Sequence, residues 1–297
     1  YDGFAAYRAG LRAGDEIVEV NGINVVGKKT EDITTMLKGQ AGTPIKLKII
    51  RLGQTTPTEI SLKREEIKVK AVPYFSMLNS EVGYVKLTSF TDNCSGEVKE
   101  AVLKLKEKNC KSLILDLRGN PGGLLHEAVN IVNLFIDKNN EVVSTRGKVK
   151  EWNKQYFSLY SPIDTQIPLV VLVDNNSASA SEIVSGALQD LDRAVILGQR
   201  SYGKGLVQQT RPLTYNTQLK VTVAKYYIPS GRCIQALDYT HKDEEGRVEK
   251  VPDSLITAFK TKNGRIIYDG AGILPDVKTE DVKYSNILAT LLNKNHI

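Results

Sequence analysis

The chain has 297 residues, which predicts two domains, and no apolar stretch approaches the ~18 residues of a membrane span. Its 40 Lys and Arg against 34 Asp and Glu give a net charge of +6, but no basic cluster is interleaved with aromatic residues, which argues against a nucleic-acid partner. Cys94, Cys110 and Cys233 are odd in number and lack metal-ligand spacing, so we expect no disulfide framework, no metal and no cofactor.

The first 66 residues are typical of a small module of short strands and helices. Residues 16–20 alternate as a strand, and Asn21-Gly22 indicates a hairpin turn directly after it. A short helix over 30–38, an alternating strand over 45–49 and a second hairpin at 53–57 follow. The basic stretch 63–70 marks the passage to a larger domain, so we expect domains at 1–66 and 67–297.

A buried strand in the larger domain runs into a glycine-rich turn. A strand over 82–90 and a helix over 95–108 come first, and then a buried strand expected over 111–118 leads into Gly119-Asn120-Pro121-Gly122-Gly123. Paired glycines let bare backbone N–H groups approach a ligand. The alternative is a tight turn without chemistry into the helix expected over 124–135.

A second buried strand, over 169–173, is followed by turn residues and then by serines at the start of a helix. A serine at this place lies where unpaired N–H groups point outward and where the helix dipole favours developing negative charge. Ser179-Ala180-Ser181-Glu182 also fits a capping box, in which the serine merely satisfies a backbone donor. Both interpretations stay open at this point.

A reactive serine needs a base, and none of the three histidines has a compelling context. His126 opens a helix after the glycine-rich turn, His241 lies in a polar stretch expected to be a loop at 238–243, and His296 is next to last. Lys204 lies between two glycines and before the apolar pair 206–207, so we expect it at the edge of an apolar layer. A free lysine has a pKa of about 10.4, and burial is needed to lower it toward neutrality. The alternative is a lysine in a surface turn.

Two other motifs overlap this lysine. Residues 198–205 resemble a phosphate-binding loop, but Gly205 stands where Ser or Thr must hold magnesium, and 206–210 indicates a strand where a helix is required. Ser201 and Lys204 match the Ser-x-x-Lys of penicillin-binding enzymes, in which the two residues lie one helical turn apart. Glycines on both sides of Lys204 argue against that helix. A further strand is expected over 219–228.

The serine segment 177–182 and the lysine segment 202–208 together resemble the C-terminal processing peptidases, also called tail-specific proteases. Residues 1–66 resemble a PDZ domain of the bacterial protease type. The resemblance implies that the carboxylate-binding loop lies upstream of Tyr1, so we expect the N-terminal part of the domain to be missing from this sequence. The resemblance covers nearly the whole chain. It implies an α/β fold with a crotonase/ClpP-like α/β spiral protease core preceded by the PDZ domain.

The resemblance also implies roles for particular residues. The nucleophile is Ser179, the base is Lys204, and Gln208 orients the lysine, while the oxyanion is bound by N–H groups of Gly122 or Gly123 and of Ala180. An alternating strand over 204–208 would put Lys204 and Gln208 on one face. Asp190 and Glu182 are supporting candidates. Asp190 ends the helix, about 16 Å from Ser179, and is treated as structural first.

The expected activity is that of a serine endopeptidase that cuts polypeptides with free C-terminal tails near their C-termini. The chain starts at Tyr1, not Met, so an export signal is expected outside it, and we expect a bacterial periplasm or cell-envelope location. A homo-oligomer is compatible with the resemblance. The alternative is a catalytically inactive ligand- or peptide-binding protein of the same PDZ and crotonase-like architecture. The intact Ser179, Lys204 and Gln208 argue against it.

Overall fold

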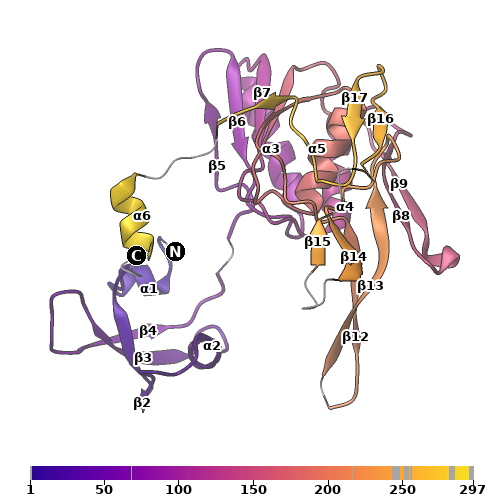
Figure 1. Ribbon diagram of the computed structural model, residues 1–297. Coiled ribbons are helices and arrows are strands. Elements are labelled where there is room, and N and C mark those ends of the chain that lie inside the picture. Colours follow the sequence, from indigo (N-terminus) through magenta and orange to yellow (C-terminus); the bar gives the residue numbers. More distant parts are fainter. Residues whose placement is uncertain are drawn as a thin grey trace. The chain divides into compact units, whose positions relative to one another are not determined.

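The computed structural model describes residues 2–67, 69–215, 217–242, 248–250, 254, 256–280 and 285–293. It separates the chain into two compact units, Tyr1–Val69 and Lys70–Ile297 (Figure 1). Each unit is built around a hydrophobic core of its own. The domain limits 1–66 and 67–297 stay a prediction.

The first unit is a four-stranded antiparallel sheet in the order β2-β1-β3-β4. Asn21 and Gly22 both have positive φ (49° and 83°), as a type I′ turn requires, so the Asn-Gly hairpin is confirmed. The core of the sheet is made by Val20, Val25 and alternate residues of β3. The elements are α1 (Ala5–Arg8), β1 (Glu16–Val20), β2 (Ile23–Asn24), α2 (Thr30–Leu37), β3 (Pro44–Ile50) and β4 (Thr58–Lys63).

The second unit contains a six-stranded sheet in the order β18-β11-β10-β7-β6-β5. All neighbours are parallel except β5 and β6. The strands are β5 (Tyr74–Met77), β6 (Val82–Lys86), β7 (Ser112–Asp116), β10 (Leu169–Val173), β11 (Val195–Gly198) and β18 (Val277–Lys278). Because β7 and β10 are parallel neighbours, the glycine-rich turn and the serine segment leave the sheet at the same edge.

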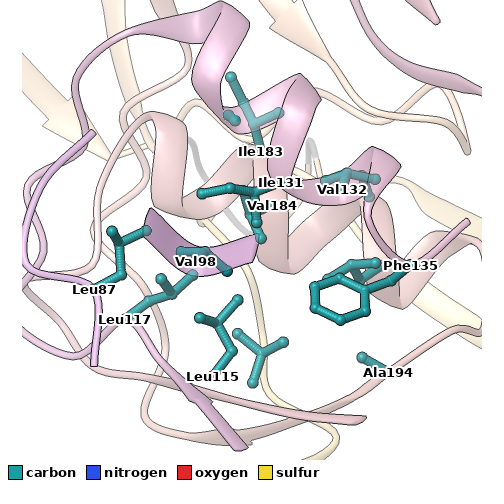
Figure 2. Close-up of a cluster of buried hydrophobic side chains, with 14 of the residues drawn as sticks. Leu87, Val98, Leu115, Leu117, Ile131, Val132, Phe135, Ile183, Val184 and Ala194 are labelled. Atoms are coloured by element: carbon teal, nitrogen blue, oxygen red, sulfur yellow. The ribbon is translucent and has the colours of Figure 1, made fainter. Parts of the chain in front are cut away.

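Helices α3 (Cys94–Glu107), α4 (Leu125–Asn133) and α5 (Ala180–Asp190) bury apolar side chains against this sheet. Figure 2 shows Val98 of α3, Ile131 of α4 and Ile183 of α5 gathered with Leu115 and Leu117 from β7 and the turn after it. Burial of one such side chain contributes about 1.5–3 kcal/mol. The core therefore fixes the start of α5 relative to the end of β7.

A second sheet, in the order β12-β13-β8-β9, leaves β12 at its edge. Its strands are β8 (Glu141–Arg146), β9 (Lys154–Phe157), β12 (Leu206–Pro212) and β13 (Gln218–Tyr227). The smaller elements are η1 (Lys150–Trp152), β14 (Leu237–Lys242), β15 (Val248–Lys250), β16 (Ala258–Lys260), β17 (Ile266–Tyr268) and α6 (Asn286–Asn293). None of the helices in the described part of the chain combines the length and apolar character needed to cross a bilayer.

One expected loop is wrong. The polar stretch 238–243 was expected to be a loop, but residues up to Lys242 form β14, which pairs with β15. The pairing partner comes from a separate segment, so the polar composition of the stretch gave no signal for it. Residues 243–247, the side chain of His241 and all of His296 lie outside what the structure describes.

Candidate active site

Ser179 has a strained backbone. It is the N-cap of α5, with φ 56° and ψ −112°, a positive φ that non-glycine residues adopt only at a cost of about 1–3 kcal/mol. Such strain is kept where the surrounding structure enforces it, and it recurs at nucleophilic serines on sharp strand-to-helix turns. The turn from β10 into α5 has this arrangement.

The serines of segment 177–182 differ in what their hydroxyls do. Ser177 is buried and donates to the Leu117 carbonyl at 2.9 Å, and Ser181 is buried and donates to the Asn120 carbonyl at 2.9 Å. Ser179 is half-buried, and its hydroxyl donates to no residue that the structure describes. Ser179 does form the expected capping box with Glu182. A capping serine accepts a hydrogen bond, so its own proton stays available for transfer.

The two candidate glycines of the oxyanion hole are not equivalent. The Gly122 N–H donates to Asn120 Oδ1 at 2.9 Å, whereas in the described part of the chain neither the Gly123 nor the Ala180 N–H has an acceptor. Gly122 has φ +96°, and a Cβ there would lie 2.6 Å from the Ala178 carbonyl and 2.8 Å from the Cβ of the serine. Gly122 therefore packs directly against Ser179, whereas the Gly123 N–H has no acceptor among the described residues.

Asn120 ties the glycine-rich turn to the serine helix, a role that the sequence did not predict. Its side chain is buried and donates to the Leu87 carbonyl at 3.0 Å, and its own carbonyl accepts the Ala178 N–H at 3.0 Å. The only sequence feature that could have suggested this role is the position of Asn120 between the buried strand and the paired glycines. The contacts themselves come from distant segments.

Asp116 anchors the end of β7, just before the turn. Tyr84 donates to its carboxylate at 2.5 Å, and the Arg118 guanidinium donates to both of its oxygens at 3.0 and 2.7 Å. Burial alone would raise the pKa of Asp116, but the hydrogen bonds from Arg118 and Tyr84 and the charge of Lys86 hold it at about 2. The strand end therefore carries a stable buried carboxylate.

The glycines around Lys204 are required by a close approach of two backbone segments. A Cβ at Gly203 would lie 2.3 Å from that of Ala236, and one at Gly205 would lie 2.7 Å from the Gln235 nitrogen. The Gly205 N–H donates to Gln235 Oε1 at 2.8 Å, and the Ala236 N–H donates to the Gly203 carbonyl at 3.0 Å. The lysine segment is thus held through its backbone.

The Lys204 side chain does not lie at the edge of an apolar layer, where we expected it from the sequence. It is exposed, and its amine makes no hydrogen bond or ion pair with any residue that the structure describes, so the expected burial at an apolar layer is wrong for this chain. The physical reason is that Lys204 borders an open cavity of about 580 Å³. Leu206 and Gln208 line the same cavity, which confirms that they share a face with Lys204.

The cavity brings the two catalytic segments together. Besides Lys204 and Gln208 it is lined by Gly119 and Pro121 of the glycine-rich turn and by Ala178, the residue before Ser179. Below it, Glu182 Oε2 accepts the N–H groups of both Ser179 and Lys204, at 2.9 and 2.8 Å. The structure therefore joins the backbones of Ser179 and Lys204 through one carboxylate.

The Ser201 hydroxyl, unlike that of Ser179, makes two hydrogen bonds with residues that the structure describes. It is buried, donates to Glu182 Oε1 at 2.5 Å and accepts the Ile273 N–H at 2.6 Å. Residues 201–205 form no helix, so the Ser-x-x-Lys spacing of one helical turn is absent. Strand β12 follows Lys204, as expected, which also excludes a phosphate-binding loop.

Asp190 lies at the other end of α5 and does not line the cavity. It is buried, and Arg232 Nη2 lies 2.9 Å from its Oδ1, while the Ser230 N–H donates to Oδ2 at 3.0 Å. Burial raises the pKa of Asp190, and the charge of Arg232 opposes this rise. These contacts give the residue a structural role at the end of the helix.

Among the described residues, one cluster has the composition of a metal site. Asp92, His126 and Glu127 offer ligand atoms within 4.8 Å of one another. Glu127 Oε2 already accepts the Ser95 N–H at 2.7 Å, and α3 and α4 both begin at this place. The positive ends of two helix dipoles disfavour a cation. The cluster therefore acts as a junction of helix starts, and His126 opens α4 as expected.

The chain matches known protein families in both of its units. The sequence model of peptidase family S41 matches residues 81–243, and that of the PDZ domain matches residues 1–51. A carboxy-terminal-processing protease of Bartonella bacilliformis is 40% identical over 243 residues, or 80% of this chain and 55% of that protein. A CtpA-like serine protease of Staphylococcus aureus (strain N315) is 39% identical over 279 residues, or 93% of this chain and 51% of that protein.

A solved structure is similar over most of the chain. The photosystem II D1 C-terminal processing protease superposes with a TM-score of 0.54 at 28% identity and covers 93% of this chain and 65% of its own. The chain spans about half the length of the curated relatives it matches.

Proposed function

Because the chain belongs to peptidase family S41 and carries a PDZ domain, we propose that it is a serine endopeptidase that cuts polypeptides near their C-termini. The observation that carries the proposal is the state of Ser179. Its hydroxyl donates to no described residue, the N–H groups of Gly123 and Ala180 have no acceptor among the described residues, and Ser179 belongs to a strained turn next to the cavity that Lys204 borders. An acyl-transfer enzyme requires this combination.

In the proposed reaction, the neutral amine of Lys204 takes the proton of Ser179, and Oγ attacks the scissile carbonyl carbon. The N–H groups of Gly123 and Ala180 receive the developing oxyanion, and one such donor contributes about 2.7–4 kcal/mol to lowering the barrier. Gln208 orients the amine. The lysine then gives its proton to the leaving amine, and water hydrolyses the acyl-enzyme.

In the proposed mechanism, the bound substrate helps to make Lys204 an effective base. The amine is exposed to the cavity in the free chain, and a base near neutral pH needs a drier environment. A polypeptide in the cavity would expel water from around Lys204 and Gln208. Base strength is therefore proposed to develop when the cavity is filled.

We assign recognition of free C-terminal tails to the PDZ unit. PDZ domains add a peptide strand to a sheet edge and bind its carboxylate through backbone N–H groups. Beside α2, this unit has a cavity of about 840 Å³ lined mainly by apolar side chains, among them Ile17, Leu37 and Leu47. The lining supports a preference for apolar tails.

The finer statements of fold and place belong to the proposal as well. A crotonase/ClpP-like spiral is supported by the run of parallel strands β6, β7, β10 and β11 with helices α3, α4 and α5 between them. Action in a bacterial periplasm or cell envelope is supported by the resemblance to exported tail-specific proteases. Cell fractionation tests that location.

The proposal is tested by incubating the chain with an unfolded polypeptide and reading the products by mass spectrometry. We expect cleavage by the wild-type chain, none by Ser179→Ala, and nearly full activity in Ser185→Ala, a buried serine of the same helix that bonds only to backbone carbonyls. Binding without cleavage by the wild type would favour the inactive binding protein instead. A peptide with a free apolar C-terminus should be cut faster than its amidated twin.

A further inference from the structure

We infer that Glu182 is a positioning residue that holds the backbones of Ser179 and Lys204 in register, an inference that rests on the proposed function. The side chain is completely buried. One of its oxygens, Oε2, accepts the N–H of Ser179 at 2.9 Å and the N–H of Lys204 at 2.8 Å. Both catalytic residues are therefore bonded to the same atom.

The second oxygen extends this link. Oε1 accepts the Gly203 N–H at 2.6 Å and the Ser201 hydroxyl at 2.5 Å. The Ser201 oxygen in turn accepts the Ile273 N–H at 2.6 Å, so its proton points to Glu182. A Cβ at Gly272 would lie 2.8 Å from the same oxygen. The base segment is thus enclosed between α5 and residues 272–273.

The four donors occupy the acceptor positions of the Glu182 carboxylate. Each carboxylate oxygen has two acceptor positions, and each of the two oxygens accepts two hydrogen bonds. Burial raises the pKa of Glu182, and the hydrogen bonds from Ser201, Lys204, Ser179 and Gly203 oppose this rise. A protonated carboxyl would have to release one donor or reverse the hydrogen bond with the Ser201 hydroxyl, so the four contacts favour the ionised form.

Glu182 accepts more hydrogen bonds than the glutamate of an ordinary capping box. A capping glutamate needs one bond, to the N-cap N–H, and glutamine serves there as well. Here glutamine would turn an amide –NH₂ toward two N–H or O–H donors, whichever way it is placed. The segment around Lys204 is flanked by glycines, which have no side chains to fix it by packing. Catalytic groups must be held within about 0.5 Å, so the carboxylate is what supplies this order.

The test compares Glu182→Gln with the wild type and with Ser185→Ala as the matched control on the same helix. We expect Glu182→Gln to lower kcat about 100-fold while KM stays within about threefold, because the change disturbs alignment and leaves the cavity lining intact. Ser201→Ala should lower kcat about fivefold to tenfold, and Ser201→Thr should restore it. An unchanged kcat in Glu182→Gln would overturn the inference.

A double-mutant cycle separates positioning from a merely structural role. The readout is the rate at which a fluorophosphonate phosphonylates Ser179, whose Oγ attacks phosphorus and displaces fluoride. In a Lys204→Ala background there is no base left to align, so Glu182→Gln should slow this reaction by less than about twofold. An equally large loss in both backgrounds would show a structural role and overturn the inference. If Glu182→Gln does not fold, Ser201→Ala in the two backgrounds gives the same cycle.

Failure of this inference can be told from failure of the proposed function. A wild-type chain that cleaves no polypeptide and reacts with no fluorophosphonate removes both. A wild-type chain that cleaves, with a Glu182→Gln variant that cleaves equally well, removes only the role of Glu182.

Discussion

The cavity has two sides that are held in different ways. On the serine side, residues 116–123 and 174–182, buried polar side chains such as Asp116, Asn120 and Ser177 bond to the backbone. On the lysine side, residues 201–208, the backbone is bonded, but the side chains of Tyr202, Lys204 and Gln208 are exposed. The buried side chains on the serine side thus contribute to folding, whereas the exposed side chains of Lys204 and Gln208 contribute little to it. Changes on the two sides should therefore differ in what they damage.

The largest effect is expected for Lys204. Lys204→Ala and Lys204→Arg should both lower the cleavage rate about 10³-fold or more, since a guanidinium cannot accept a proton and general-base catalysis contributes about 10²–10⁴-fold. The melting temperature should hardly change, because the side chain bonds to no described residue. A peptide cleavage assay measures the rate, and thermal unfolding measures the melting temperature. Substantial activity in Lys204→Arg would show that the lysine supplies charge alone.

Gly122→Ala should lower both the cleavage rate and the stability, unlike the Lys204 variants, which should lower the rate alone. The new Cβ would lie 2.6 Å from the Ala178 carbonyl, at φ +96°, and would displace the turn against which Ser179 packs. We expect a rate about 100-fold lower together with a lower melting temperature. Gly119→Ala is the control, because it shares a positive φ but has open space around its Cβ. Equal losses in the two variants would mean that strain, and not the close contact, is responsible.

Asp116→Asn should affect stability with little direct effect on chemistry. The folded pKa of about 2 against an ordinary 3.8 gives the ionised form about 2 kcal/mol of stability. A lowered pKa means that this contribution is present above about pH 4 and is lost as the pH falls through 2. Urea unfolding of wild type and variant from pH 7 to 2.5 measures it. A difference that stays constant with pH would refute the assignment.

The smallest effect is expected for Gln208→Ala, about fivefold in rate at unchanged stability. The side chain is exposed and lines the cavity beside Lys204, so it can orient the amine but moves no proton. Gln209→Ala, one residue further along β12 and absent from the cavity lining, is the matched control. If the two variants lose the same rate, β12 matters as a strand and Gln208 has no role of its own.

Much of this architecture follows from local patterns. The apolar run 169–173, the helix after Ser179 and the strand after Gly205 could be predicted because burial imposes a period on the sequence, and the serine and lysine motifs located the two halves of the site. The bonds that join the halves could not be predicted. Three of the four donors to Glu182 belong to Ser201, Gly203 and Lys204, far from it in the sequence, whereas the Ser179 N–H is the local capping-box donor. The Asn120 contacts with Leu87 and Ala178 likewise join distant segments. The exposure of Lys204 likewise depends on the shape of a cavity, which no spacing of residues encodes.

The exposed position of Lys204 affects which inactivating substitutions can persist during evolution. A substitution there would remove the proposed base and leave the hydrogen-bonded backbone and the core untouched, so we expect the product to fold, to resist degradation and to keep its surfaces for binding. Quality-control proteases and chaperones, which respond to unfolding, would not detect it. Loss of activity can therefore become fixed silently on the lysine side. A comparable accident at the buried residues of the serine side would be removed with the misfolded chain.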